Sequence, residues 1–197
     1  MDSKVEQIET PHVAAEADAS LRLSADLPSL ARRAVETFVV ERRIVAPPRS
    51  ATSSLLNQRS ACFVCIKTAG RELRGCVGTV EPEHDSLAEE VVSNAIKAAT
   101  RDPRFRPVSP DELRLLRYSV DVLGVLEPTR LEELDPSVFG VVVVDESGAR
   151  RGLLLPDIEG IDTPDQQVGV ASRKAGITPH EPFKLYRFRT RRFSETA

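Results

Sequence analysis

Apolar side chains recur every three to four residues in three stretches of the sequence, at 27–43, 86–100 and 163–176. This spacing predicts three helices, each with one buried face. The second and third stretches open on a serine or threonine that is followed three residues later by glutamate or glutamine, the pattern of an N-terminal capping box. A further capping box with a proline at Pro110 predicts a short additional helix.

Other stretches are short, rich in β-branched and aromatic residues, and bounded by turn residues, so they predict strands. The predicted strands span 60–68, 72–80, 118–126, 138–146, 150–155 and 183–190. The turn pairs Ala69-Gly70 and Ser147-Gly148 join four of these strands into two hairpins. Each hairpin precedes a predicted helix, and hairpins with helices packed against them indicate the α+β class.

The composition fits a globular domain. The chain has 197 residues, 41% of them hydrophobic, and a net charge of −3, which gives no overall field that would attract nucleic acid. No apolar run approaches the ~18 residues of a membrane helix. We expect residues 1–23 to be a disordered tail and residues 24–197 to form the domain. Alternating basic and apolar residues at 184–189 predict an outer strand rather than a nucleic-acid surface.

The sequence contains three cysteines, Cys62, Cys65 and Cys76. This small, odd number fits the reducing cytoplasm better than a disulfide framework. Cys62 and Cys65 form a C-x-x-C pattern, but they lie in a predicted strand, where side chains three residues apart point to opposite faces. We therefore expect both to pack against other side chains, and we predict neither a metal site nor a cofactor.

The second predicted strand carries residue types that a strand does not favour. Gly75 and Gly78 have no side chain to pack, so they indicate a bulge or a close approach to the backbone. Cys76 lies between them and is a candidate nucleophile, because Arg74 on the same face would stabilise its thiolate. Uncovered amides near the glycines, with the hydroxyl of Thr79, would hold an anion. Alternatively, the cysteine is a small buried apolar residue.

The loop after the second predicted helix reads R-D-P-R-F-R-P at 101–107. Arg104 is a candidate for anion recognition, with Asp102 holding it in place; the alternative is a solvated turn with local ion pairs. His84 precedes the helix that follows the Cys76 strand, and is a weak candidate for a general base.

The sequence L-R-G-C-V-G-T at 73–79 resembles the L-R-G-C-[IV]-G-T signature of the AMMECR domain family, whose prokaryotic members are called AmmeMemoRadiSam system protein A. D-P-R-F at 102–105, L-L-P at 154–156 and R-K-A-G at 173–176 resemble further elements of the family in the same order. The resemblance covers nearly the whole chain apart from the tail. The chain departs from the family at 83–85, where basic residues are common.

This resemblance implies an α+β fold with two hairpin–helix repeats around one curved, barrel-like antiparallel sheet, flanking helices, a cleft at the signature and room for a small second lobe. No activity is established for the family. The resemblance also implies a component of a modification pathway, with a radical SAM protein and a Memo-type protein as partners. The cysteine count predicts that this component is cytoplasmic.

Two functions stay open at this point. In the first, the protein is an enzyme component in which Cys76 is the nucleophile or covalent acceptor and Arg74 and Arg104 bind an anionic group. In the second, the same cleft belongs to a non-catalytic module that binds a peptide or metabolite, or that docks a partner. We expect no nucleic-acid or membrane partner for either.

Overall fold

The computed structural model describes residues 27–47 and 54–195, so the predicted tail at 1–23 lies outside the described residues. The elements are a helix at residues 27–41, α2 (Ser54–Asn57), β1 (Cys62–Thr68), β2 (Leu73–Gly78), α3 (Leu87–Thr100), the 3-10 helix η1 (Pro110–Leu115), β3 (Leu116–Leu123), β4 (Glu127–Pro128), the 3-10 helix η2 (Leu131–Glu133), β5 (Gly140–Asp145), β6 (Arg151–Leu154), α4 (Pro164–Ala175), β7 (Phe183–Phe188) and β8 (Thr190–Ser194). The predicted helices and hairpins are confirmed to within a few residues.

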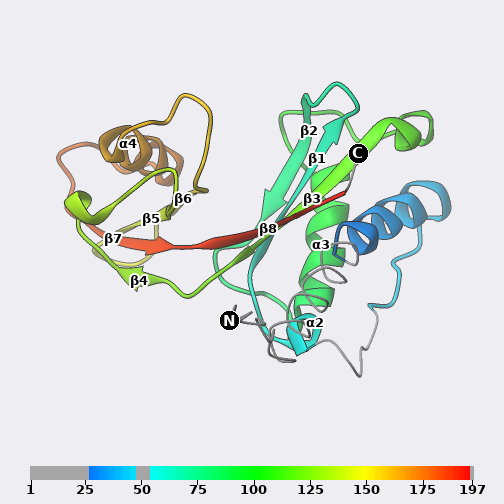
Figure 1. The fold of residues 1–197 in the computed structure, drawn as a ribbon, viewed down its shortest axis with the longest axis horizontal. Helices are drawn as coiled ribbons and strands as arrows, with labels where there is room; N and C mark the ends of the chain where they lie inside the picture. Colours follow the sequence, from blue (N-terminus) through cyan, green and yellow to red (C-terminus); the bar gives the residue numbers. More distant parts are fainter. Residues whose placement is uncertain (1–26, 48–53, 196–197) are drawn as a thin grey trace, which may run out of the picture.

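The strands form two four-stranded antiparallel sheets, with the orders β2-β1-β3-β8 and β4-β7-β5-β6. The first sheet, α3 and the helix at residues 27–41 make the N-terminal lobe, and the second sheet with α4 makes the C-terminal lobe (Figure 1). Each lobe contains a hairpin, then a helix, then a third strand. The predicted hairpin–helix repeat is therefore confirmed.

The short last strand of each repeat pairs with the sheet of the other lobe. β4 follows β3 but pairs with β7, and β8 follows β7 but pairs with β3. Figure 1 shows β7 and β8 as one long run from the C-terminal lobe into the N-terminal lobe. Buried apolar side chains from both lobes fill the junction: Ala61, Leu123, Val142, Leu153, Leu155 and Phe188. The lobes thus share backbone hydrogen bonds and a common core.

In both repeats the helix lies very close to the second strand of its hairpin, at a glycine. A Cβ atom added at Gly75 of β2 would overlap the carbonyl oxygen of Ala98 in α3. A Cβ atom added at Gly152 of β6 would overlap the carbonyl oxygen of Ala171 in α4 in the same way. The close approach expected at Gly75 is confirmed, and it recurs in the second repeat.

A buried amide side chain makes a second matching contact in each repeat. Asn94 of α3 donates a 3.0 Å hydrogen bond to the carbonyl oxygen of Cys62 at the start of β1. Gln167 of α4 donates a 2.7 Å bond to the carbonyl oxygen of Phe139, just before β5. Both amides are fully buried. The two repeats therefore hold helix to hairpin by the same two contacts, although their sequences differ.

Two expectations about the sheet are wrong. The described strands form two open sheets instead of one barrel-like sheet, because β2 and β6 are free edges. The strand at 183–190 was expected at an outer position, but β7 lies between β5 and β4. The sequence pattern did not reveal β4, which has two residues, or β8, which is rich in charged residues.

Candidate functional site

The signature lies on β2, whose register with β1 is irregular. The pairing shifts after Ile66, so that Leu73 lies opposite Lys67 and Arg74 is the extra residue of a bulge. On a regular strand Arg74 would take the place opposite Lys67, on the same face as Cys76. A bulge interrupts the regular alternation of side chains, so the argument that places Arg74 and Cys76 on one face of a regular strand does not apply here.

The guanidinium of Arg74 is bound by a carboxylate of the protein itself. Its Nε and Nη2 atoms lie 2.7 and 3.0 Å from the carboxylate of Glu112 in η1, and its side chain is only 14% exposed. This bidentate contact lowers the pKa of Glu112 to about 2. The ring of Phe105 lies 5.9 Å from the guanidinium carbon of Arg74. Arg74 thus links β2 to the loop that follows α3 and to η1.

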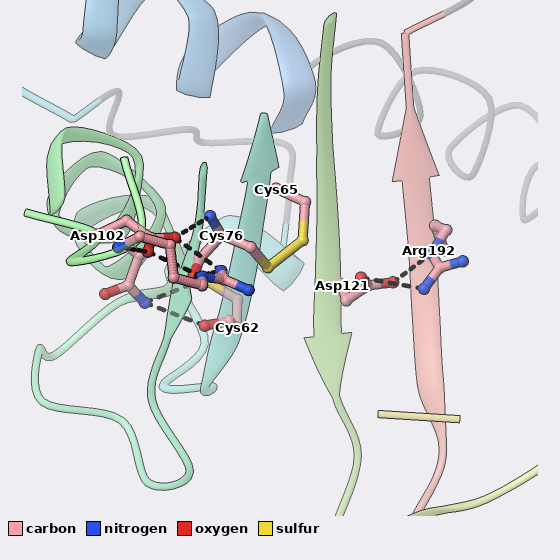
Figure 2. Close-up of a disulfide and its surroundings, with 8 residues drawn as sticks. Cys62, Cys65, Cys76, Asp102, Asp121 and Arg192 are labelled. Carbon is pink, nitrogen blue, oxygen red and sulfur yellow. Dashed lines mark hydrogen bonds and ion pairs between the residues drawn. A yellow bond between two sulfur atoms is a disulfide. The ribbon is translucent and has the colours of Figure 1, made fainter. Parts of the chain in front are cut away.

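The main-chain groups of Cys76 on the free edge of β2 are covered by the loop that follows α3 (Figure 2). The amide of Cys76 donates a 2.9 Å hydrogen bond to Oδ2 of Asp102, and Nη2 of Arg104 lies 3.5 Å from the carbonyl oxygen of Cys76. Asp102 and Arg104 thus bind the main-chain groups of Cys76 that a neighbouring strand would otherwise bind. The amide that was expected to hold a ligand anion holds Asp102 instead.

Asp102 and Arg104 form a bidentate ion pair, as the sequence predicted. Nη2 and Nε of Arg104 lie 2.7 and 3.0 Å from the carboxylate oxygens of Asp102. This contact, with the amide of Cys76, lowers the pKa of Asp102 to about 2, although burial acts in the opposite direction. Asp102 is buried and Arg104 is half exposed, so only the arginine is presented to solvent.

A buried carboxylate of α3 holds the segment after β2. Glu90 accepts hydrogen bonds from the hydroxyl of Thr79 and from the amides of Glu83 and His84. Thr79 is itself buried, so its hydroxyl is bound by the helix and is not offered to a ligand. The imidazole of His84 lines a cavity of about 350 Å³ against α3. The cavity lies on the α3 side of the sheet, whereas the side chain of Cys76 points away from α3. His84 is therefore not close enough to Cys76 to act as its general base.

Cys65 and Cys76 lie directly opposite each other on β1 and β2 and form a disulfide (Figure 2). The expectation that the chain uses no disulfide, and that Cys65 packs separately, is therefore wrong. Both cysteines are partly exposed on the sheet face that points away from α3. Cys62 points to the α3 side, where burial raises the pKa of its thiol to about 12, so the opposite facing of Cys62 and Cys65 is confirmed.

The sheet face that carries the disulfide forms one wall of a groove of about 650 Å³. Residues of β1, β3 and β8 line this wall, and residues 157–159 of the C-terminal lobe form the other. Ser119 lies directly opposite Cys65, and Ser194 lies opposite Ser119. Two hydroxyl-bearing residues therefore continue the row of the disulfide across the sheet and into the groove.

The two walls of the groove carry unpaired charges of opposite sign. On the sheet side lie Lys67, Arg71 and Arg117, which are exposed and have no carboxylate partner in the described part of the chain. On the other side lie Asp157 and Glu159, which are exposed and form no ion pair among the same residues, although the charge of Asp157 acts on Arg192. The groove is thus positive on one side and negative on the other.

The remaining charges in the groove are already paired. Nε of Arg192 lies 2.7 Å from the carboxylate of Asp121, whose side chain is almost completely buried (Figure 2). Glu195 is bound at 2.6 Å by Nε of Arg32. These two pairs contribute no net charge, so the character of the groove is set by the unpaired residues of its walls.

Lys174 of α4 occupies a position in the C-terminal lobe like that of Arg104 in the N-terminal lobe. Its Nζ donates a 3.1 Å hydrogen bond to the carbonyl oxygen of Leu153, the residue after Gly152 on the edge strand β6. Partial desolvation lowers the pKa of Lys174, and the positive charge of Arg104 lowers it further. The two cations therefore lie near each other, although they come from different lobes.

The sequence of this chain matches a known protein family over most of its length. The AMMECR1 family matches residues 28–194. The chain belongs to the AMMECR1 family. A Thermotoga maritima protein is 46% identical over 163 residues, which cover 82% of this chain and 92% of that protein. The crystal structure of the uncharacterised protein PH0010 from Pyrococcus horikoshii aligns with a TM-score of 0.77 and 30% identity, over 86% of this chain and 89% of that one.

A second AMMECR1 relative, protein CA_C1420 of Clostridium acetobutylicum, is longer than this chain. It is 42% identical over 149 residues, which cover 76% of this chain but 31% of that protein. Within the described residues of this AMMECR1 protein, no group of three or more histidine, cysteine, aspartate or glutamate residues could hold a metal ion. The helices of the described ranges are also too short or too polar to cross a membrane.

Sequence reasoning missed the groove cations of this AMMECR1 protein. Lys67 follows Cys65 by two residues on β1, so the strand period alone could have placed Lys67 on the same face as Cys65. Arg117 lies directly opposite Lys67 on β3. The pairing of these strands is non-local, so no pattern within either strand reveals it. Of the cations that were expected to bind a ligand anion, Arg74 is paired with Glu112, and Arg104 is held by Asp102 as expected and stays half exposed.

Proposed function

We propose that this protein binds a short peptide with free termini in the groove between its lobes. The observation that supports this ligand is the opposite unpaired charge of the two groove walls. The carboxylate of the peptide lies against Lys67, Arg71 and Arg117 on the sheet side. Its ammonium group lies against Asp157 and Glu159 on the side of the C-terminal lobe.

The dimensions and chemistry of the groove suit such a ligand. Its volume of about 650 Å³ falls within the range of roughly 300 to 1,000 Å³ that is common for small-molecule sites. Arginine binds a carboxylate through two parallel N–H groups, which gives strong and directional contacts. Ser119 and Ser194 also line the groove, and their hydroxyls suit the main chain of a peptide.

This proposal selects the binding module from the two functions that the sequence leaves open, because Cys76 has no free thiol in the disulfide. A peptide ligand suits a pathway that modifies a protein. Membership of such a pathway, the radical SAM and Memo-type partners and the cytoplasmic location stay predictions, and so does a nucleophilic role for Cys76.

Thermal unfolding of the full chain with tetra-alanine peptides tests the proposal. Four forms are compared: free termini, N-acetylated, C-amidated and blocked at both ends. A ligand at about 100 times its Kd stabilises the native state by ~2.7 kcal/mol, and at about 2 to 4 °C per kcal/mol for a chain of this size the Tm rises by roughly 5 to 10 °C. We expect this rise with free termini only. If no peptide raises the Tm, or the doubly blocked form raises it equally, the proposal is wrong.

A further inference from the structure

The backbone of the Cys65–Cys76 pair brings the two sulfur atoms together before any bond forms. Cys76 directs its N–H to Asp102 and its carbonyl oxygen towards Arg104, so both groups point away from β1. A cross-strand pair with this orientation is a non-hydrogen-bonded pair, the type with the shorter Cα separation. The Cα atoms are 4.1 Å apart. The strand register thus keeps the sulfurs adjacent whether or not they are bonded.

The N-terminal lobe holds this hairpin by contacts that do not involve the disulfide. β1 pairs with β3 along its whole length, from Cys62 to Thr68. On the other face of the sheet, Gly75 lies against Ala98 of α3. The bridge joins two strands of a single hairpin, only 11 residues apart in sequence. When the disulfide opens, β1 and β2 therefore remain connected through their strand pairing.

The disulfide is accessible, whereas the third cysteine is not. Cys65 and Cys76 are partly exposed on the sheet face that forms one wall of the groove, and Cys65 lies opposite Ser119, which lines the groove. Cys62 is buried on the opposite side of the same sheet. A thiol attacks a disulfide only as the thiolate and only where it can reach a sulfur atom. An external thiol can therefore reach the pair, and the internal thiol cannot.

We propose that Cys65 and Cys76 form a reversible thiol–disulfide couple that exchanges electrons with an external thiol, either a small-molecule thiol or a cysteine pair of another protein. A thiolate of the reductant attacks one sulfur, the S–S bond breaks, and the other cysteine leaves as a thiolate that takes up a proton. A second reductant thiolate then resolves the mixed disulfide. Two reductant thiols become one disulfide, and the protein gains two electrons and two protons.

This thiol–disulfide couple is a property separate from the proposed peptide site, and the experiment that tests it requires no peptide. In the dithiol form Cys76 carries a free thiol at the centre of the signature, beside the groove. The redox state then decides whether a nucleophile is present there. In the disulfide form the same residue is inert towards a substrate.

Peptide mass spectrometry of the folded full chain tests the couple. The protein is equilibrated in buffers with increasing ratios of reduced to oxidised glutathione, quenched with acid, and alkylated before and after denaturation. We expect Cys65 and Cys76 to pass together from the disulfide to two alkylated thiols, and back on reoxidation, with an unchanged circular dichroism spectrum. Cys62 is alkylated only after denaturation. If the bond opens only in denaturant, or its opening unfolds the chain, the couple is excluded.

Two serine variants provide the matched controls. Cys62→Ser keeps both members of the couple, and we expect the full cycle to persist. Cys65→Ser removes the partner that resolves a mixed disulfide, so oxidised glutathione should leave Cys76 carrying one glutathione. A Cys65→Ser protein whose Cys76 stays unmodified would contradict access by external thiols.

Discussion

The amide nitrogen of Cys76 lies 2.9 Å from the carboxylate oxygen Oδ2 of Asp102. This contact joins the signature strand to the loop at the far end of α3, and it covers the main-chain edge of β2 at the signature cysteine. The two most distinctive sequence motifs of the chain are therefore parts of one structure. Their residues serve chiefly to hold β2 in place beside the groove.

Replacing Asp102 tests that structural role. Asp102→Ala leaves the amide of Cys76 without its acceptor and Arg104 without its partner, and an unsatisfied buried group costs about 1 to 3 kcal/mol. We expect a loss of that size in the free energy of unfolding, measured with urea. Asp111→Ala is the control, because Asp111 is exposed and has no side-chain partner in the described ranges; it should change stability by less than about 0.5 kcal/mol. Equal effects of the two changes would refute the role.

Glycine at position 75 is required by the packing of α3. Gly75→Ala would place a methyl group on the carbonyl oxygen of Ala98, and such overpacking costs typically about 1 to 3 kcal/mol. Gly152→Ala should cost a similar amount, because it meets Ala171 in the same way. In Gly70→Ala the new atom would lie 3.6 Å from Oγ1 of Thr68, an ordinary contact. Thermal unfolding should therefore separate Gly70→Ala from the other two; a normal Tm for Gly75→Ala would rule out this packing.

The stability of the N-terminal lobe should fall in acid. The pKa values of Asp102 and Glu112 are both about 2 in the folded protein, below the values of about 3.9 and 4.3 for free side chains. Their contribution is therefore complete above about pH 5 and is lost as the pH falls through 4 towards 2. Urea unfolding at successive pH values should show this loss. The double variant Asp102→Asn, Glu112→Gln should show a smaller slope, and parallel slopes would contradict the assignment.

The hydroxyl of Thr79 should control the mobility of the segment after β2. Thr79→Val removes one donor from the buried carboxylate of Glu90, at a cost of about 1 to 3 kcal/mol. The amides of Glu83 and His84, which bind the same carboxylate, should then exchange with deuterium faster. Thr79→Ser keeps the hydroxyl and should keep the slow exchange. Unchanged exchange in Thr79→Val would show that the hydroxyl is not needed to hold this segment.

The sequence predicted local features of the fold correctly and non-local ones poorly. The helix at Leu87–Thr100 and its capping box at Ser86 follow from residues within a few positions of each other. The division into two sheets depends on β4 and β8, which pair with the opposite lobe. Strands of that length carry almost no periodic signal, and nothing within them specifies a distant partner.

The same distinction applies to the candidate site. Asp102 and Arg104 are two residues apart in a loop bounded by prolines, so their ion pair could be predicted. The disulfide of Cys65 with Cys76 depends on the register of a hairpin, and a bulge at Arg74 shifts that register. An error of one residue in register moves every side chain to the other face. For this reason the face of Arg74 could not be predicted from the strand pattern. The disulfide was missed on a different ground, since three cysteines were expected to fit a reducing compartment.

Calorimetric titration of a groove variant tests the central claim most directly. Arg117→Ala removes an unpaired cation from the groove wall, whereas Arg114→Ala removes an exposed arginine that lies outside it. With tetra-alanine of free termini, we expect saturable binding to the unmodified chain and to Arg114→Ala. Binding to Arg117→Ala should be at least roughly tenfold weaker, since a charge-assisted contact contributes about 1.5 to 3 kcal/mol. Equal affinity of both variants, or no binding to the unmodified chain, would contradict the account.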